Sequence, residues 1–110
     1  MVDRKQIAID FAKSLNHPEI EKVILFGSVA RGDDTGESDI DILIFTKKEE
    51  DEFKIRDDVY GKTFRTLLET GEYLSAKITP INHYKKYKNF SFYSNVDKEG
   101  VIIGWSRHSI

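Results

Sequence analysis

Residues 23–45 read VILFGSVARGDDTGESDIDILIF, and this stretch decides the fold. Two apolar runs enclose a polar, glycine-bearing loop, which is typical of two buried strands joined by a short connection. The first run ends at a Gly27-Ser28 turn, and Asp39 and Asp41 open the second. Residues two apart on a strand point to the same face, so we expect two carboxylates side by side, close to that turn.

The residue types in this stretch indicate a site for a cation and a phosphate. Two carboxylates this close repel each other unless a cation lies between them. A hard ion such as Mg²⁺ takes oxygen ligands from carboxylates and from nucleotide phosphates together. Gly27 lets the backbone approach a ligand closely, and Ser28 offers a hydroxyl and N–H groups at a helix start. We therefore predict a metal-dependent nucleotide site with Asp39 and Asp41 as the metal ligands.

Two further residues of the loop are candidates for contacts with the nucleotide. Arg31 is suited to neutralising a phosphate, and equally to lying in solvent. Ser38 is suited to orienting Asp39 by a hydrogen bond, with capping of the loop as the alternative. The loop acids Asp33 and Asp34 are expected to be solvated.

Composition limits the class of protein. The chain has 110 residues, which fits a single domain over residues 1–110. Its net charge of -2 gives no general attraction to nucleic acid or to acidic membranes. It has no cysteine, which excludes disulfides and zinc–thiolate sites. No apolar stretch is long enough to span a bilayer and no signal peptide is recognisable, so we expect a cytoplasmic protein.

Apolar periodicity and turn residues predict an alternation of helices and strands. The expected elements are a helix capped by Asp3 and stopped at residues 16–18, strands at 22–26, 39–46 and 73–79, a short helix at 28–32, a long helix ending at Gly71, helices at 83–88 and 90–98, and an edge strand at 101–105. This order indicates an α/β (α+β) fold, with helices packed against a sheet of three to five strands. The connection between the first two strands is too short for a full parallel crossover, so we expect a mixed sheet.

Large apolar side chains in the second half of the chain are assigned to the core. On the long helix, we expect the buried side to consist of Phe53, Tyr60, Phe64, Leu67 and Leu68, with Gly61 weakening the helix in its middle. Further along, Phe90, Phe92, Tyr93 and Trp105 are expected to lie mostly in the core, and any that is exposed would mark an interface. A basic and aromatic cluster at residues 84–88 is interpreted as a solvated helix face rather than an RNA-binding one.

The pattern Gly27-Ser28, ten residues, then Asp39-Ile40-Asp41 resembles the motif of the nucleotidyltransferase superfamily that includes DNA polymerase β. The surrounding GSVARG and SDIDILI are most similar to its minimal nucleotidyltransferase (MNT) branch. The resemblance implies a nucleotidyltransferase-like fold and Mg²⁺-dependent transfer of a nucleoside monophosphate, usually AMP from ATP, to an acceptor. It also implies a separately encoded helical partner of the HEPN type, in a toxin–antitoxin pair.

The chain departs from that family at one position. The family usually has a third carboxylate on a neighbouring strand, where it completes the metal site and activates the acceptor hydroxyl. The polar face of residues 73–79 carries Ser75 and Lys77 instead, and Glu72 is the nearest acid. The catalytic set predicted here is therefore Asp39, Asp41 and Glu72.

The alternative is a binding module without catalysis, which neutralises a helical partner and keeps a vestigial nucleotide site. An RNA-directed transferase is a third reading, against which the small size argues.

Overall fold

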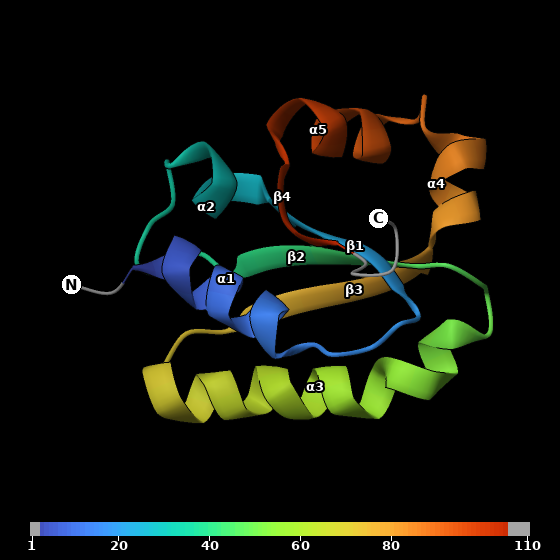
Figure 1. Ribbon diagram of the computed structural model, residues 1–110. Coiled ribbons are helices and arrows are strands. Elements are labelled where there is room, and N and C mark those ends of the chain that lie inside the picture. Colours follow the sequence, from blue (N-terminus) through green and yellow to red (C-terminus); the bar gives the residue numbers. More distant parts are fainter. Residues whose placement is uncertain (1–2, 106–110) are drawn as a thin grey trace.

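The computed structural model describes residues 3–105, which form a four-stranded mixed sheet with helices on both faces (Figure 1). The elements in chain order are α1 (Arg4–Ser14), β1 (Ile20–Phe26), α2 (Gly27–Arg31), β2 (Ile40–Thr46), α3 (Asp51–Thr70), β3 (Leu74–Pro80), α4 (Ile81–Tyr87), α5 (Ser91–Glu99) and β4 (Val101–Trp105). The predicted fold class and the predicted order of elements are confirmed. None of the helices in the described range is both long and apolar enough to cross a lipid bilayer.

The strands lie in the order β3-β2-β1-β4. β1 pairs antiparallel with β2 and with β4, whereas β2 pairs parallel with β3. The short segment through α2 can only reverse the chain, while the 20 residues of α3 are long enough for a parallel crossover. The mixed sheet expected from the lengths of these connections is confirmed, with β4 as an edge strand.

The register of the three strands β1, β2 and β3 brings Asp41 into the middle of the sheet. Phe26, the last residue of β1, pairs with Asp41, and Asp41 pairs with Ser75 on β3. Because side chains alternate along a strand, Asp41 shares its face with Leu43 and not with Ile40. The two faces of β2 therefore separate the polar group from the main core.

Each face of the sheet has its own hydrophobic cluster. Beneath one face, α1 and α3 pack against a cluster that contains Ile40, Ile42 and Ile44. On the opposite face, α4 and α5 cover Leu43 and Phe45. Figure 1 shows this layering, with α3 on one side of the sheet and α4 and α5 on the other.

The aromatic residues near the end of the chain do not all lie in the core. Tyr93 is buried as expected, but Phe90, Phe92 and Trp105 are exposed, which corrects their assignment to the core. α5 turns one side toward the sheet and buries Tyr93 and Val96 there, so the neighbouring rings point elsewhere. Trp105 ends an edge strand that is mostly open to solvent.

The expected buried side of α3 is wrong. The residues that α3 turns to the sheet are Ile55, Val59 and Thr63, at a spacing of four. The aromatic residues predicted to be buried lie on the outside, with exposed fractions of 72% at Phe53, 46% at Tyr60, 60% at Phe64 and 70% at Leu68, while Leu67 is half-buried. The helix runs through Gly61 without a break. Two sides of α3 are thus apolar, and the less aromatic one packs against the sheet.

Candidate functional site

Asp41 lies directly against the backbone of Gly27. Gly27 has a φ of +76°, which turns the chain from β1 straight into α2. A Cβ added at Gly27 would collide with a carboxylate oxygen of Asp41 and would lie 3.1 Å from its Cγ. Position 27 therefore requires glycine for its backbone angle and for the space that the Asp41 carboxylate occupies.

The carboxylates of Asp39 and Asp41 are close enough for the charge of one to act on the other. Asp39 precedes the first residue of β2 and is exposed, whereas Asp41 is half-buried. Burial raises the pKa of Asp41, the charge of Asp39 raises it further, and the charge of Arg31 opposes both. The pair is therefore unfavourable in its doubly ionised form, and a bound cation would relieve this repulsion.

The raised pKa of Asp41 predicts that cation binding weakens in mild acid. A carboxyl whose pKa is raised by folding holds its proton more tightly, and a cation must displace that proton at pH values below the raised pKa. We expect the affinity for Mg²⁺ with α,β-methylene-ATP to be constant above this pKa and to fall by about tenfold per pH unit below it. Calorimetric titrations between pH 4 and pH 8 measure this. An affinity that stays constant down to pH 4, close to the ordinary aspartate pKa of 3.8, would contradict the prediction.

Arg31 is held at the rim of the site by two acids. Its Nε lies 3.2 Å from Asp33 and one of its terminal nitrogens lies 2.9 Å from Glu99 of α5. These contacts join the end of α2 to the end of α5 across 68 residues of sequence. Contact between Arg31 and a phosphate remains a prediction. A bound phosphate would have to compete with the carboxylates of Asp33 and Glu99 for the Arg31 guanidinium. The role of Glu99 had no local signal in the sequence.

Ser38 is engaged within its own loop. Its hydroxyl accepts a hydrogen bond from the backbone N–H of Thr35 at 3.0 Å and lies 3.2 Å from the Thr35 hydroxyl. These contacts are those of a loop cap, which was the alternative interpretation. Orientation of Asp39 by Ser38 remains a prediction.

Arg4, which sequence reasoning missed, links three segments around the site. Its guanidinium donates to Glu72 at 3.0 Å, to Asp34 at 3.0 Å, and to the backbone oxygens of Thr35 and of Gly36. It thereby ties the start of α1 to the loop before β2 and to the residue that precedes β3 by two positions. Its partners lie 30 or more positions away, so no short-range pattern indicates this role.

Glu72 faces Arg4, and its carboxylate is largely buried in this ion pair. Residues 3–105 contain no group of three histidine, aspartate or glutamate side chains arranged to hold a metal ion. The role of Glu72 as a third carboxylate therefore remains a prediction. It requires the Glu72 side chain to leave its ion pair with Arg4 and to turn toward Asp39 and Asp41. Ser75, whose backbone pairs with that of Asp41, lies with Lys77 on the face of β3 where an acid was expected.

An aromatic cavity lies on the same face of the sheet. Lys77, two residues beyond Ser75, places its ammonium nitrogen 5.1 Å from the centre of the Phe92 ring. Phe92 in turn packs edge-on against Phe26, whose backbone pairs with Asp41. The cavity has a volume of about 400 Å³ and is lined by Lys77, Ile78, Thr79, His83, Tyr87, Phe90, Phe92 and Tyr93.

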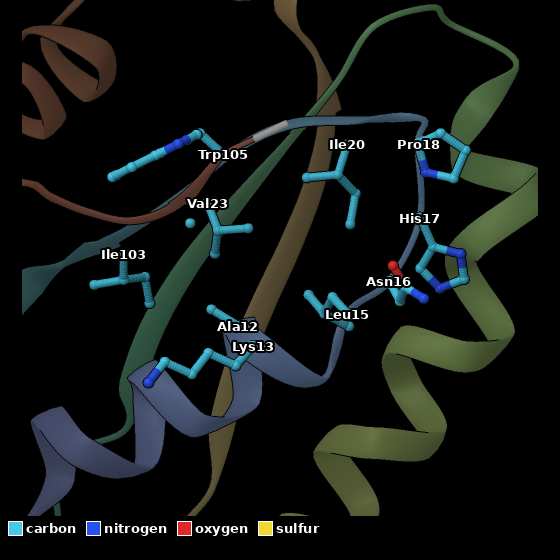
Figure 2. A pocket seen from close by; sticks show the side chains of 11 residues that line it. Ala12, Lys13, Leu15, Asn16, His17, Pro18, Ile20, Val23, Ile103 and Trp105 are labelled. Carbon is cyan, nitrogen blue, oxygen red and sulfur yellow. The ribbon is translucent and has the colours of Figure 1, made fainter. Parts of the chain in front are cut away.

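A second cavity, of about 260 Å³, lies at the opposite end of β1 (Figure 2). Ile20 and Val23 of β1 line it, together with the end of α1 and residues 103–105 of β4. Figure 2 shows apolar side chains around most of it, with Lys13 and His17 at its margin. It contains no carboxylate and none of the predicted site residues.

Comparison with known proteins gives a consistent set of relatives. The sequence profile described as "Polymerase beta, Nucleotidyltransferase" matches residues 9–103. A protein of Methanocaldococcus jannaschii, named "Putative protein adenylyltransferase MJ0604", is 38% identical over 95 residues, which cover 86% of this chain and 89% of the relative.

Two solved structures are similar to this chain. The crystal structure of "a putative nucleotidyltransferase from Sulfolobus solfataricus" is 27% identical with a TM-score of 0.50, and the match covers 97% of this chain and 80% of that one. A toxin–antitoxin structure "with AMP-PNP" is 17% identical with a TM-score of 0.56, covering 94% of this chain and 74% of that one. At 17% identity, the second likeness concerns the fold alone.

Proposed function

This chain belongs to the polymerase beta nucleotidyltransferase family, and on that basis we propose that it is a Mg²⁺-dependent protein adenylyltransferase. The family resemblance predicted from the sequence is thereby confirmed. The reaction proposed is transfer of AMP from ATP to a hydroxyl group of a protein acceptor. The observation that carries the proposal is the Asp41 carboxylate, which lies against Gly27 and beside Asp39.

The donor set at this site suits Mg²⁺. Mg²⁺ in proteins usually takes one or two carboxylates and completes its shell with waters and substrate phosphates. Asp39 and Asp41 would supply the two carboxylates, and the triphosphate would supply further oxygens. When bound, the ion would draw charge from the phosphates and favour attack at the α-phosphorus.

The side chains of this protein would position the triphosphate and the acceptor. The bend at Gly27-Ser28 lets backbone N–H groups approach phosphate oxygens, and Arg31 at the rim would neutralise the departing pyrophosphate. The acceptor oxygen forms a bond to the α-phosphorus, while the bond from that phosphorus to the bridging oxygen breaks. Pyrophosphate leaves with the electron pair, and the acceptor proton passes to a base, for which Glu72 is the candidate.

A second candidate function is binding without transfer. The polar face of β3 carries Ser75 and Lys77 where an acid was expected, and Glu72 is paired with Arg4. In this case the chain would neutralise a helical partner of the HEPN type and would retain nucleotide binding. The fold shared with a toxin–antitoxin structure supports such a partner.

Labelled ATP distinguishes the two functions. We expect incubation with Mg²⁺, the chain and the helical protein encoded beside it to transfer label from [α-³²P]ATP and none from [γ-³²P]ATP. Label from the γ-phosphate would indicate a kinase and contradict the proposal. Calorimetric binding of ATP with no transfer to the partner would establish the binding module instead.

The role of Glu72 has its own test. If Glu72 acts as the third carboxylate, Glu72→Gln lowers the rate of transfer by about 10²-fold or more, because the acceptor loses its base. We expect ATP affinity, measured by calorimetry, to change little. Asp34→Asn is the matched control, since it removes the other ion pair of Arg4 and leaves Glu72 in place. Equal transfer by Glu72→Gln and the wild type would remove Glu72 from the mechanism.

A further inference from the structure

The side of α3 that faces away from the sheet is unusually apolar. We call it the outer face of α3 and define it by Phe53, Tyr60, Phe64 and Leu68, all of which are exposed. Their spacing of seven, four and four residues places them in one row, because seven residues make nearly two helical turns. In Figure 1, α3 is the lowest element, and no other helix or strand of residues 3–105 lies beneath it.

The fold of this chain does not account for the outer face. α3 is held to the sheet by Ile55, Val59 and Thr63, which lie on its opposite side. Single exposed apolar residues are common on protein surfaces, whereas a continuous row bordered by polar groups marks an interaction site. Tyr60, Phe64 and Leu68 form such a row, and Phe53 extends it beyond the exposed acid Asp57.

Gly61 is a second, independent observation that points the same way. It lies midway along the outer face, and a glycine inside a helix destabilises it relative to alanine. Nothing in residues 3–105 requires glycine there, since its φ is not positive and a Cβ would meet no atom of them within 4 Å. A glycine beside a row of large side chains leaves a notch in which a second helix could approach closely.

The charges around the outer face indicate the kind of partner. Three exposed cations, Lys54, Arg56 and Arg65, border it, and the exposed acid Asp57 lies within the row. Two further exposed acids of α3 lie toward α1: Asp58 is paired with His17 and Lys62, and Glu69 lines the hollow between α1 and α3. The Arg56 guanidinium lies over the ring of Phe53, 5.2 Å from its centre, so this positive charge is fixed at the apolar surface. A partner with acidic residues along the borders of its own apolar stripe would complement this pattern.

We propose that the outer face of α3 is the docking surface for an amphipathic helix of another protein, with acidic residues on both sides of its apolar stripe. A second copy of this chain fits poorly. Antiparallel pairing of two α3 helices in the register that sets Phe53 against Leu68 would place Arg56 opposite Arg65 of the other copy. Parallel pairing would place each cation beside its own copy. Like charges at such positions disfavour association.

The docking surface and the nucleotide site lie on different sides of the molecule. α3 packs on the sheet face that carries Ile42, whereas Asp41 belongs to the opposite face. A partner on α3 therefore leaves the site open. The inference goes beyond the proposed transfer and does not depend on it, so it is tested without ATP.

Two synthetic helices of about 28 residues serve as probes. Both carry leucine along one stripe, and the stripe is bordered by glutamate in one peptide and by lysine in the other. We expect the acidic peptide to bind at least tenfold more tightly by fluorescence anisotropy, and the amide resonances of α3 to shift in NMR spectra. Equal binding of the two peptides, or shifts confined to other elements, would overturn the proposal.

Three variants assign the binding to the outer face. Phe64→Ser with Leu68→Ser should weaken binding of the acidic peptide at least tenfold, and Arg56→Glu with Arg65→Glu should reverse the preference between the peptides. Gly61→Ala should raise the melting temperature of the free chain and still weaken peptide binding, an outcome that misfolding does not produce. Unchanged binding by Gly61→Ala, or a wild-type chain that sediments as a dimer through α3, would overturn the proposal.

Discussion

Asp41→Asn is expected to lower the rate of AMP transfer by about 10³-fold or more, because it removes the carboxylate nearest to the Gly27 turn. An amide oxygen is a weaker ligand for a hard cation than a carboxylate oxygen, and the substitution removes one of the two negative charges that would attract the cation. Transfer from [α-³²P]ATP to the protein acceptor measures the effect. Glu37→Gln is the control, since Glu37 is an exposed acid of the same loop. Undiminished transfer by Asp41→Asn would contradict the assignment of this residue.

The same substitution is expected to stabilise the folded chain. Burial and the neighbouring Asp39 raise the pKa of Asp41, so the ionised form opposes folding at every pH above the raised pKa. Removing the charge should therefore raise the melting temperature at pH 7. The gain should disappear at acidic pH, where Asp41 of the wild type is protonated. A lower melting temperature at pH 7 would show that the charge is satisfied within the chain.

Gly27→Ala is expected to damage both the fold and the site. A non-glycine residue at a φ of +76° costs about 1–2 kcal/mol, and the collision of the new Cβ with Asp41 adds about 1–3 kcal/mol. Moving the Asp41 carboxylate by about 1 Å should slow transfer by roughly 10²-fold. Urea denaturation and the labelling assay measure the two effects.

Gly32→Ala separates backbone strain from the collision. Gly32 has a nearly identical φ of +82°, but a Cβ there would meet nothing within 4 Å. We expect Gly32→Ala to lose only the strain of about 1–2 kcal/mol and to retain transfer. The difference between the two alanine variants is the contribution of the contact between Gly27 and Asp41. Similar stability and similar rates in both variants would mean that this contact is unimportant.

The sheet was predictable because its determinants are local. The apolar runs before Gly27 and after Asp39, and the short connection between them, indicate two adjacent strands in antiparallel order. The proximity of Asp41 to Gly27 also follows, since both lie where these two strands meet. These inferences required only residues within one stretch of 23 positions.

The orientation of α3 was not predictable from periodicity. The helix has two apolar sides, and the one with Phe53 and Phe64 carries larger, more aromatic side chains than the one with Ile55 and Val59. Periodicity identifies apolar sides but does not show which of them meets the sheet. An apolar helix side that binds a partner has the same sequence pattern as one that packs in the core. The second apolar side of α3 therefore explains both the wrong assignment of its buried residues and the proposed docking surface.

The contacts of Arg4 were also beyond reach of the sequence. Its partners Asp34 and Glu72 are far along the chain and come together only when the fold is complete. A positive residue in the first turn of a helix looks like an ordinary surface residue. Sequence patterns therefore located the predicted ligands of the site but not the residue that fixes the segments around them.

The sheet that divides the two surfaces has a consequence for how such proteins evolve. Asp41 is on one side of β2, and the row on α3 is beyond the other. A single substitution near Gly27 could abolish nucleotide transfer and leave the contacts between α3 and a partner protein unchanged. Such a protein would still recognise its partner and would no longer transfer a nucleotide. The polar face of β3, which carries Ser75 and Lys77 and no acid, is compatible with that outcome.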